Sequence, residues 1–496
     1  MRTESRLRAD TIGPMGLAAL AIGITSPAIG LYATWGPMQS GGGPITPLIF
    51  LAAMVLVLPT AISYAQLNRE APSAGAASTW LWIALSPASG FLAGLFMTTY
   101  FFMAAAAQPL MFSLFFLDLL EWLHLKVSPI WGSLSGVLLA CVPVAWVCLR
   151  GAEASIKLTI RLMVIETLVV LALSATVLIT KSRVPDGITF EAFDPRLAHG
   201  FSGFCAALIF GVLDFCGFDV VSTAAEEARA PRAYLPKAIL LTVVAMGVFW
   251  ALNAWAFTLS IPDDLVRTYT AEGLTAVTPM AEAYWGDGRV IIILTAFTGI
   301  TAVSISSMQG VSRIVFALAR HHLLPSSLAA LAGEKRVPRT AVLTILLSVV
   351  GLDLGSLILL GNGLDAFSWW ANALVFFATL TFLSVNAANI LFLTKGRSKR
   401  RYGAAGLLVP ILGVLLNGYL LYAAFFLTLW GGSWRTGKSV VTGAIGLLVL
   451  EIGVVIFVRV FRPALLTQGP PLGVEPDFFA EDIDAAGSTG RVTAEV

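Results

Sequence analysis

Long hydrophobic stretches recur along the chain from residue 12 to residue 461, and short polar segments separate them. Each stretch has at least about 18 residues, enough for a helix to cross a hydrocarbon core of about 30 Å. The pattern predicts an all-α polytopic membrane protein with twelve spanning helices. We expect the spans at residues 12–36, 45–67, 84–117, 128–149, 156–180, 200–226, 235–260, 289–319, 339–361, 367–394, 405–430 and 439–461.

The composition agrees with this pattern. Hydrophobic residues make up 57% of the 496 residues and charged residues only 12%, whereas soluble proteins have about 25% charged residues. The first span is expected to be retained, because Arg2, Arg6 and Arg8 lead into a stretch that further spans follow. The four cysteines all fall within expected spans, so neither a disulfide framework nor a zinc site is predicted.

Charged residues predict the orientation. Lys and Arg gather in one set of alternate loops, among them the run at residues 395–401. Such loops stay on the cytoplasmic side, so we expect both termini in the cytoplasm and a multi-pass protein of the plasma or inner membrane. The segments are then a cytoplasmic N-terminal segment (1–11), a ten-helix transport core (12–394), two additional spanning helices (395–461) and an acidic cytoplasmic tail expected to be disordered (462–496).

Two spans five apart are interrupted by residues that disfavour a continuous helix. The first holds Gly23, Thr25, Ser26, Pro27 and Gly30 near its middle, and the sixth holds Gly211, Asp214, Gly217 and Asp219. Small residues are also common where spanning helices pack closely. Paired interruptions nevertheless favour two inverted repeats of five helices, at about 12–180 and 200–394, with a substrate site between broken helices. We expect the breaks near residues 24–30 and 213–217, where free N–H groups could bind a carboxylate and exposed oxygens an ammonium.

Three stretches resemble a known family. Residues 217–239 contain Gly-Phe-Asp, Ala-Glu-Glu-Ala-Arg, and Pro-Arg-Ala-Tyr-Leu-Pro-Lys-Ala-Ile, which resemble the sixth-helix motif of the amino acid-polyamine-organocation permeases. Residues 64–94 and 312–325 agree with other parts of that family's pattern. The resemblance covers all twelve spans. It implies a LeuT-like fold with a 5+5 inverted repeat, working by alternating access as a secondary transporter of amino acids or related amines.

The resemblance also implies a substrate site between the first and sixth spans, with weaker candidates on the third and eighth. The residues at the matching positions are Ile24, Thr25, Ser26, Ala28, Gly30, Phe210, Leu213, Asp214 and Gly217, with Tyr100 and Ser307 as the weaker candidates. The chain departs from the family pattern at Ala230, which replaces an asparagine, and at His321-His322, which replace Asp-Gly. Glu166 stands about where several members carry a lysine that serves the coupling ion.

Asp214, Asp219 and Glu166 lie within expected spans, where a carboxylate is energetically costly and usually has a function. A carboxylate removed from water takes up a proton more readily, so Asp219 or Glu166 could carry a coupling proton. A salt bridge from Glu166 to Arg161 or Lys157 is the structural alternative. Asp214 could attract an ammonium, which would favour cationic or amine substrates, or it could simply be capped by a hydroxyl or a free N–H.

Other function classes fit less well. An enzyme is disfavoured, because the chain has no nucleophile elbow, phosphate loop or metal-ligand spacing, and no cofactor, metal or nucleic acid is expected. An inorganic cation transporter and a non-transporting nutrient sensor remain alternatives. If sodium replaces the proton as coupling ion, Ser306 and Ser307 offer oxygen ligands. The sequence leaves open the substrate, the choice between symport and exchange, the direction of transport, and whether the protein is a monomer or a homodimer.

Overall fold

The computed structural model describes residues 12–150, 152–272, 274–320, 322–332, 337–395, 402–432 and 434–466. These residues contain twelve helical spans that are long and apolar enough to cross a membrane. The twelve predicted spans are therefore confirmed, and the last one matches to the residue, at Ser439–Phe461. The N-terminal segment, His321, the basic run 396–401 and the tail from residue 467 onward lie outside the described residues.

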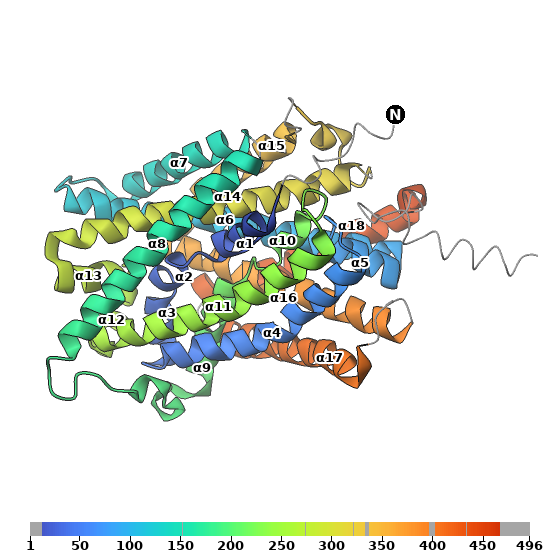
Figure 1. Ribbon diagram of the computed structural model, residues 1–496. Coiled ribbons are helices and arrows are strands. Elements are labelled where there is room, and N and C mark those ends of the chain that lie inside the picture. The colour runs from blue at the N-terminus through green and yellow to red at the C-terminus, as the bar shows by residue number, and fades with distance from the viewer. Residues whose placement is uncertain are drawn as a thin grey trace, which may run out of the picture.

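The spans are formed by eighteen α-helices and several shorter turns (Figure 1). The first five spans and their extensions are α1 (Pro14–Thr25), α2 (Ile29–Tyr32), α3 (Trp35–Gly42), α4 (Thr46–Glu70), α5 (Ala77–Ala84), α6 (Pro87–Trp122), α7 (Pro129–Cys148) and α8 (Ala152–Lys181). The next five are α9 (Gly200–Phe215), α10 (Val220–Thr223), α11 (Pro231–Ser260), α12 (Asp263–Ala271), α13 (Val277–Trp285), α14 (Val290–Arg320), α15 (Arg339–Leu360) and α16 (Gly363–Thr394). The last two are α17 (Gly403–Leu420), which continues as a π-helix, η5 (Leu421–Leu429), and α18 (Ser439–Phe461).

The eighth span is longer than predicted. The sequence pattern places it at residues 289–319, whereas the helical segment runs over Val277–Arg320. The difference arises because α13 and a 3₁₀ turn, η3 (Gly286–Arg289), lead without a gap into α14. Polar residues such as Glu282 and Asp287 hide this extension from a hydropathy pattern.

The long helix α6 lies at the centre of the packing. It contacts α14, α16, α7 and α5, while α4 packs along α11. Glycines allow the closest approaches, because spanning helices associate through small residues. At Gly90 of α6, a Cβ atom would stand 2.4 Å from Cβ of Trp82 on α5, and at Gly136 of α7 it would stand 2.8 Å from Cα of Ser113 on α6.

Both predicted helix breaks are present. In the first span, α1 ends at Thr25 and α2 begins at Ile29, with Ser26 at φ 38°. In the sixth span, α9 ends at Phe215 and α10 begins at Val220, with Gly217 at φ 113°. Glycine adopts this backbone conformation without the steric cost that other residues meet. Pro27 contributes to the first break because it has no N–H to continue the helical hydrogen bonds.

One end of the helix bundle is closed by ion pairs. The N–H of Ile12, just before α1, donates to the carbonyl of Glu227 at 2.9 Å, and the N–H of Arg229 donates back to Ile12 at 2.9 Å. Two guanidinium groups of α14 meet the same loop, Arg313 with Glu227 at 2.7 Å and Arg320 with Glu226 at 3.0 Å. The start of the first span is thus tied to the end of the sixth.

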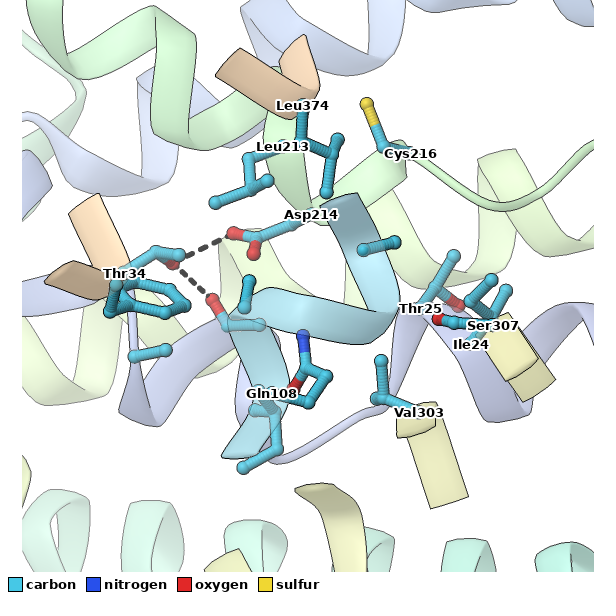
Figure 2. Close-up of a pocket in the computed structure, with 16 residues that line it drawn as sticks. Ile24, Thr25, Thr34, Gln108, Leu213, Asp214, Cys216, Val303, Ser307 and Leu374 are labelled. Carbon is cyan, nitrogen blue, oxygen red and sulfur yellow. Dashed lines mark hydrogen bonds between the residues drawn. The ribbon is translucent and has the colours of Figure 1, made fainter. Parts of the chain in front are cut away.

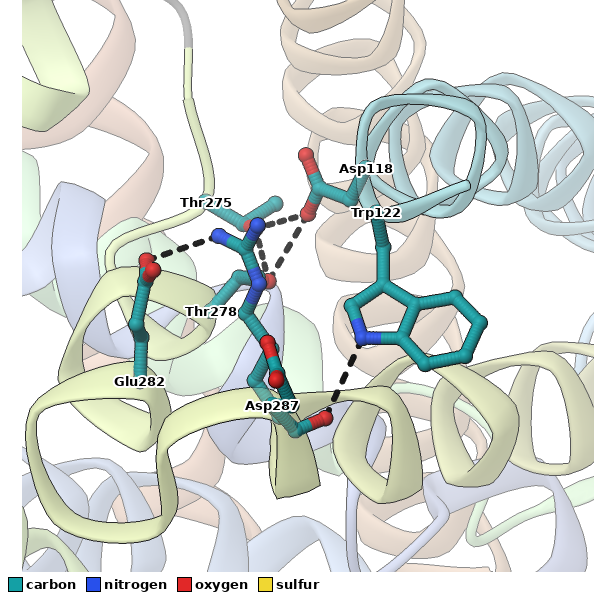
Figure 3. A network of polar contacts seen from close by, with 7 residues as sticks. Asp118, Trp122, Thr275, Thr278, Glu282 and Asp287 are labelled. Atoms are coloured by element: carbon teal, nitrogen blue, oxygen red, sulfur yellow. Dashed lines mark hydrogen bonds and ion pairs between the residues drawn. The ribbon is translucent and has the colours of Figure 1, made fainter. Parts of the chain in front are cut away.

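The opposite ends of α6 and α14 meet in a network that Figure 3 shows. The carboxylate of Asp118 on α6 accepts hydrogen bonds from Thr278 at 2.7 Å and Thr275 at 3.1 Å. Trp122 of α6 donates its indole N–H to the carbonyl of Asp287 at 3.2 Å, while Arg289 pairs with Glu282 at 2.7 Å. The network fastens the segment that precedes α14 to the end of α6.

Candidate functional site

A cavity lies between the two helix breaks (Figure 2). Its volume is about 50 Å³, measured as the space open to the centre of a water molecule. On that measure one water needs roughly 10–15 Å³, so the cavity has room for only a few atoms. It is lined by Ile24, Thr25, Ile29, Gly30, Ala33 and Thr34 of the first span, by Ala104, Ala107 and Gln108 of α6, by Leu213, Asp214 and Cys216 of the sixth span, and by Val303, Ser307, Phe367 and Leu374.

The structure brings together about half of the residues that the sequence suggests for the site. Those that line the cavity are Ile24, Thr25, Gly30, Leu213, Asp214 and Ser307, whereas Ser26, Ala28, Tyr100, Phe210 and Gly217 do not. The second group still lies close by. Ser26 and Ala28 belong to the first break and face α8, and the Tyr100 hydroxyl is directed at Asp219.

Asp214 is the acidic residue of the cavity wall. Its Oδ2 accepts a hydrogen bond of 2.7 Å from the hydroxyl of Thr34, and the same hydroxyl is also within hydrogen-bond reach of the Gly30 carbonyl. Figure 2 shows Asp214 reaching into the space between Thr34 and Gln108. A hydroxyl therefore caps one oxygen of Asp214, while the carboxylate also lines the cavity, and the attraction of an ammonium stays a prediction.

Glu166 contacts the first break and, among the described residues, does not pair with Arg161 of its own helix. Its Oε2 accepts a hydrogen bond of 2.5 Å from the Ser26 hydroxyl, and the Ala28 N–H also points to the carboxylate. Among the described residues it makes no ion pair with Arg161, while the side chain of Lys157 lies outside them. The alternative of a salt bridge to Arg161 is therefore wrong. Glu166 is fully buried, and its Oε1 has no hydrogen-bond partner in the described part of the chain.

Asp219 lies on the far side of the sixth-span break and is completely buried. Its two oxygens accept hydrogen bonds from two tyrosine hydroxyls, Tyr64 of α4 and Tyr100 of α6, each at 2.9 Å. The backbone N–H groups of Gly217 and of Asp219 itself are also directed at this carboxylate. The tyrosine rings in turn pack on aromatic neighbours, including Phe218 and Phe382. Asp219 thus holds the break in place and does not face the cavity.

Gly217 is packed against the first span and not against open space. A Cβ atom at this position would stand 2.7 Å from two atoms of the Ile24 side chain. The resemblance implies that Gly217 belongs to the substrate site, where a glycine would leave space for the ligand. In the structure that space is taken by Ile24, which is itself a cavity residue, so Gly217 shapes the cavity through its neighbour.

Sequence reasoning missed ten lining residues, of which two carry polar groups on long or branched side chains. Gln108 lies in the middle of α6, and polar residues inside a span are a usable signal for a site. Thr34 had no such signal, because a threonine near the end of a span is ordinary. The other missed residues are Ile29, Ala33, Ala104, Ala107, Cys216, Val303, Phe367 and Leu374, which differ in no way from packing residues until the fold is known.

The described residues contain no group of three or more His, Cys, Asp or Glu side chains that could hold a metal ion. Ser306 and Ser307, the oxygen ligands considered for sodium, are both buried, and their hydroxyls have no hydrogen-bond partner within the part of the chain that is described. Ser307 lines the cavity, whereas Ser306 faces Gly23 of α1.

Comparisons with known proteins agree on one family. A family model described as amino acid permease matches residues 12–450. The branched-chain amino acid permease BcaP of Bacillus subtilis is 25% identical over 361 residues, which cover 70% of this chain and 74% of the relative. The methylthioribose transporter of Bacillus subtilis is 24% identical, covering 90% and 94%. The low-affinity putrescine importer PlaP of Escherichia coli is 24% identical, covering 79% and 83%.

Proposed function

Because this chain belongs to the amino acid permease family, we propose that it is a secondary transporter that moves an amino acid or a related amine across the cell membrane by alternating access. The observation that carries the proposal is the cavity between the two helix breaks, lined from the first, third, sixth, eighth and tenth spans. A site at the meeting point of broken helices is the arrangement by which such folds bind a substrate in mid-membrane. Both termini are proposed to lie in the cytoplasm, on the basis of the cation distribution.

Alternating access requires that each end of the core can be released in turn. The ion pairs of Arg313 and Arg320 join α14 to the loop after α10, and the Asp118 hydrogen bonds join α6 to the segment before α14. In the proposed cycle these two contact sets open at different times. Separating a buried ion pair costs about 3–5 kcal/mol and losing a hydrogen bond to a charged group about 1.5–3 kcal/mol, so the ion-paired end would set the higher barrier.

We propose proton coupling through Glu166, with Asp219 as the rival site. A coupling proton needs an oxygen that is free to take it and a contact that changes when it arrives. Glu166 has both, since Oε1 has no partner among the described residues and Oε2 holds Ser26 at the first break. Protonation would weaken that contact, because a neutral carboxylic acid is a poorer acceptor than a carboxylate. Asp219 already accepts from two hydroxyls and two N–H groups.

The test is uptake by proteoliposomes that contain the purified protein. Radiolabelled alanine, arginine and putrescine are compared, with and without an inward proton gradient. Uptake of at least one of them, stimulated by the gradient, is the expected result. Uptake of sodium or another inorganic cation in place of all three would favour a cation transporter, and binding without any uptake would favour a nutrient sensor.

A further inference from the structure

The hydrogen-bond donors at both helix breaks are already used by the protein. In the first break, the N–H of Ser26 donates to Ile22, and the N–H groups of Ile29 and Gly30 both donate to Ser26, at its Oγ and its carbonyl. Pro27 has no N–H, and that of Ala28 points to Glu166. The N–H groups that the sequence argument expected for a substrate carboxylate are therefore directed at groups of the protein in this part of the described chain.

The N–H groups of the sixth-span break are likewise directed at groups of the protein. The N–H of Cys216 donates to Leu213 at 2.9 Å, and that of Phe218 to Phe215 at 3.3 Å. The N–H groups of Gly217 and Asp219 are directed at the Asp219 carboxylate. Two carboxylates of the protein, Glu166 and Asp219, thus lie where a carboxylate of the substrate would have to meet these donors.

The third carboxylate, that of Asp214, faces the cavity and has one neutral donor, Thr34. None of the sixteen described residues that line the cavity is Lys, Arg or His. A charged carboxylate in such an environment is costly unless a cation pairs with it. A zwitterionic amino acid would place its own carboxylate in a cavity that contains a negative charge and offers it no unused backbone donor at the breaks.

We propose that the substrate is an organic amine without a carboxylate, whose ammonium group pairs with Asp214. This inference rests on the proposed function and deepens it. The ammonium donates to the Asp214 oxygen that Thr34 leaves free, in a charge-assisted hydrogen bond. The side chain of Gln108 lies across the cavity from Asp214 (Figure 2) and adds a polar contact for the rest of the ligand. Ala104, Ala107 and Gly30 keep this space free of larger side chains.

Thr34 is a positioning residue in this arrangement. A hydroxyl has one proton to donate, yet that of Thr34 lies within reach of both Asp214 and the Gly30 carbonyl. When an ammonium pairs with Asp214, the hydroxyl can turn to Gly30 and remain satisfied. The amine is thereby sensed at the first span as well as at the sixth.

The experiment compares pairs of ligands that differ only by the carboxylate. The full-length protein in proteoliposomes is tested for binding and uptake of ethylamine against alanine, putrescine against ornithine, and agmatine against arginine. We expect the amine of at least one pair to bind at least about tenfold more tightly than its amino acid, which is about 1.4 kcal/mol. Equal or tighter binding of the amino acid in every pair would overturn the inference and leave the proposed function intact. Neither binding nor uptake of any member would instead defeat the proposed function.

Variants test the role of the carboxylate. Asp214→Asn keeps the size of the side chain but removes its charge, and amine affinity should fall roughly tenfold to a hundredfold. Asp264→Asn is the matched control, because that aspartate is exposed on α12 and does not line the cavity. Should Asp214→Asn fail to fold, Thr34→Val is the second variant, with an expected loss of about threefold to tenfold. Unchanged amine affinity in a folded Asp214→Asn protein would overturn the inference.

Discussion

The two helix breaks look alike along the chain but are stabilised differently. At the sixth-span break, the hydroxyls of Tyr64 on α4 and Tyr100 on α6 donate to one residue, Asp219, which belongs to the break itself, and the N–H groups of Gly217 and Asp219 are directed at the same carboxylate. At the first-span break, the side-chain contacts between spans come from distant residues: the Glu166 carboxylate of α8 accepts from the Ser26 hydroxyl and faces the Ala28 N–H, and the indole of Trp250 on α11 donates to the Pro27 carbonyl at 3.3 Å. We infer that the sixth-span break is the more rigid of the two, because the residue that accepts its hydrogen bonds belongs to the break, whereas a change at α8 or α11 can release the first-span break.

This difference separates the work of the three carboxylates. Asp219 accepts hydrogen bonds within the sixth-span break, Glu166 accepts one from Ser26 at the first-span break, and Asp214 lines the cavity between them; in the proposed mechanism they fix one break, release the other and bind the substrate, respectively. In a coupled transporter, binding of the substrate and binding of the ion influence each other through a helix that can adopt two conformations. Such a helix moves relative to a part of the protein that stays fixed. We therefore infer that the sixth-span break stays fixed and that the first-span break moves.

The largest expected effect comes from Gly217→Leu, which attacks the rigid break directly. The new side chain would have to adopt φ 113° and would collide with Ile24, 2.7 Å from its Cβ. Left-handed backbone costs about 1–2 kcal/mol and overpacking about 1–3 kcal/mol. We expect uptake to be lost while the protein is still inserted in the membrane. Gly351→Leu on α15 is the control, because nothing lies within 4 Å of a Cβ there. Wild-type uptake by Gly217→Leu would show that this break is not as constrained as the structure indicates.

The second prediction concerns the movable break. Glu166→Gln keeps a side chain that can hold Ser26 but cannot take up a proton. We expect proton-gradient stimulation of uptake to disappear, while exchange of external for internal substrate continues. Counterflow and gradient-driven uptake measured on the same vesicles separate the two. If stimulation persists in this variant, coupling through Glu166 is excluded, and Asp219 becomes the site to test.

The third prediction is the matching change at the rigid break. Asp219→Asn replaces an oxygen that accepts hydrogen bonds by an NH₂ group that cannot, so at least one of the two tyrosine hydroxyls loses its partner. We expect a loss of stability of about 1–3 kcal/mol, seen as a lower midpoint of thermal unfolding in detergent. Gradient stimulation should remain in the protein that folds. Its disappearance here but not in Glu166→Gln would transfer the coupling role to Asp219 and reverse the comparison.

The smallest expected effect is that of Tyr100→Phe, which removes one of the four donors and leaves the ring in place. Loss of a hydrogen bond to a charged acceptor costs about 1.5–3 kcal/mol, and the three donors that remain should keep the loss near the lower limit. The unfolding midpoint of Tyr419→Phe gives the baseline, since Tyr419 is 53% exposed on α17. A midpoint equal to that control would mean that the Tyr100 hydroxyl adds nothing to the break.

The sequence by itself determined the spans, the two breaks and the family. The length of a hydrophobic segment is enough to place a helix in a bilayer, whatever its neighbours are. Gly and Pro interrupt a helix because of their own backbone properties, so both features can be recognised in the sequence alone. The residues of the breaks were therefore found with good accuracy, including Asp214 and Ile24 of the cavity wall.

Only the tertiary structure decided which way each side chain faces. Tyr100 and Asp219 read as site residues in the sequence, yet they bind each other, while Gln108 and Thr34 line the cavity. Facing depends on the rotation and packing of helices from distant parts of the chain, and a spanning helix that is apolar all round gives no amphipathic signal to fix that rotation. The partners of the backbone N–H groups at the breaks also depend on the tertiary structure. The carboxylate that faces the Ala28 N–H, for example, belongs to Glu166, which lies 138 positions further along the chain.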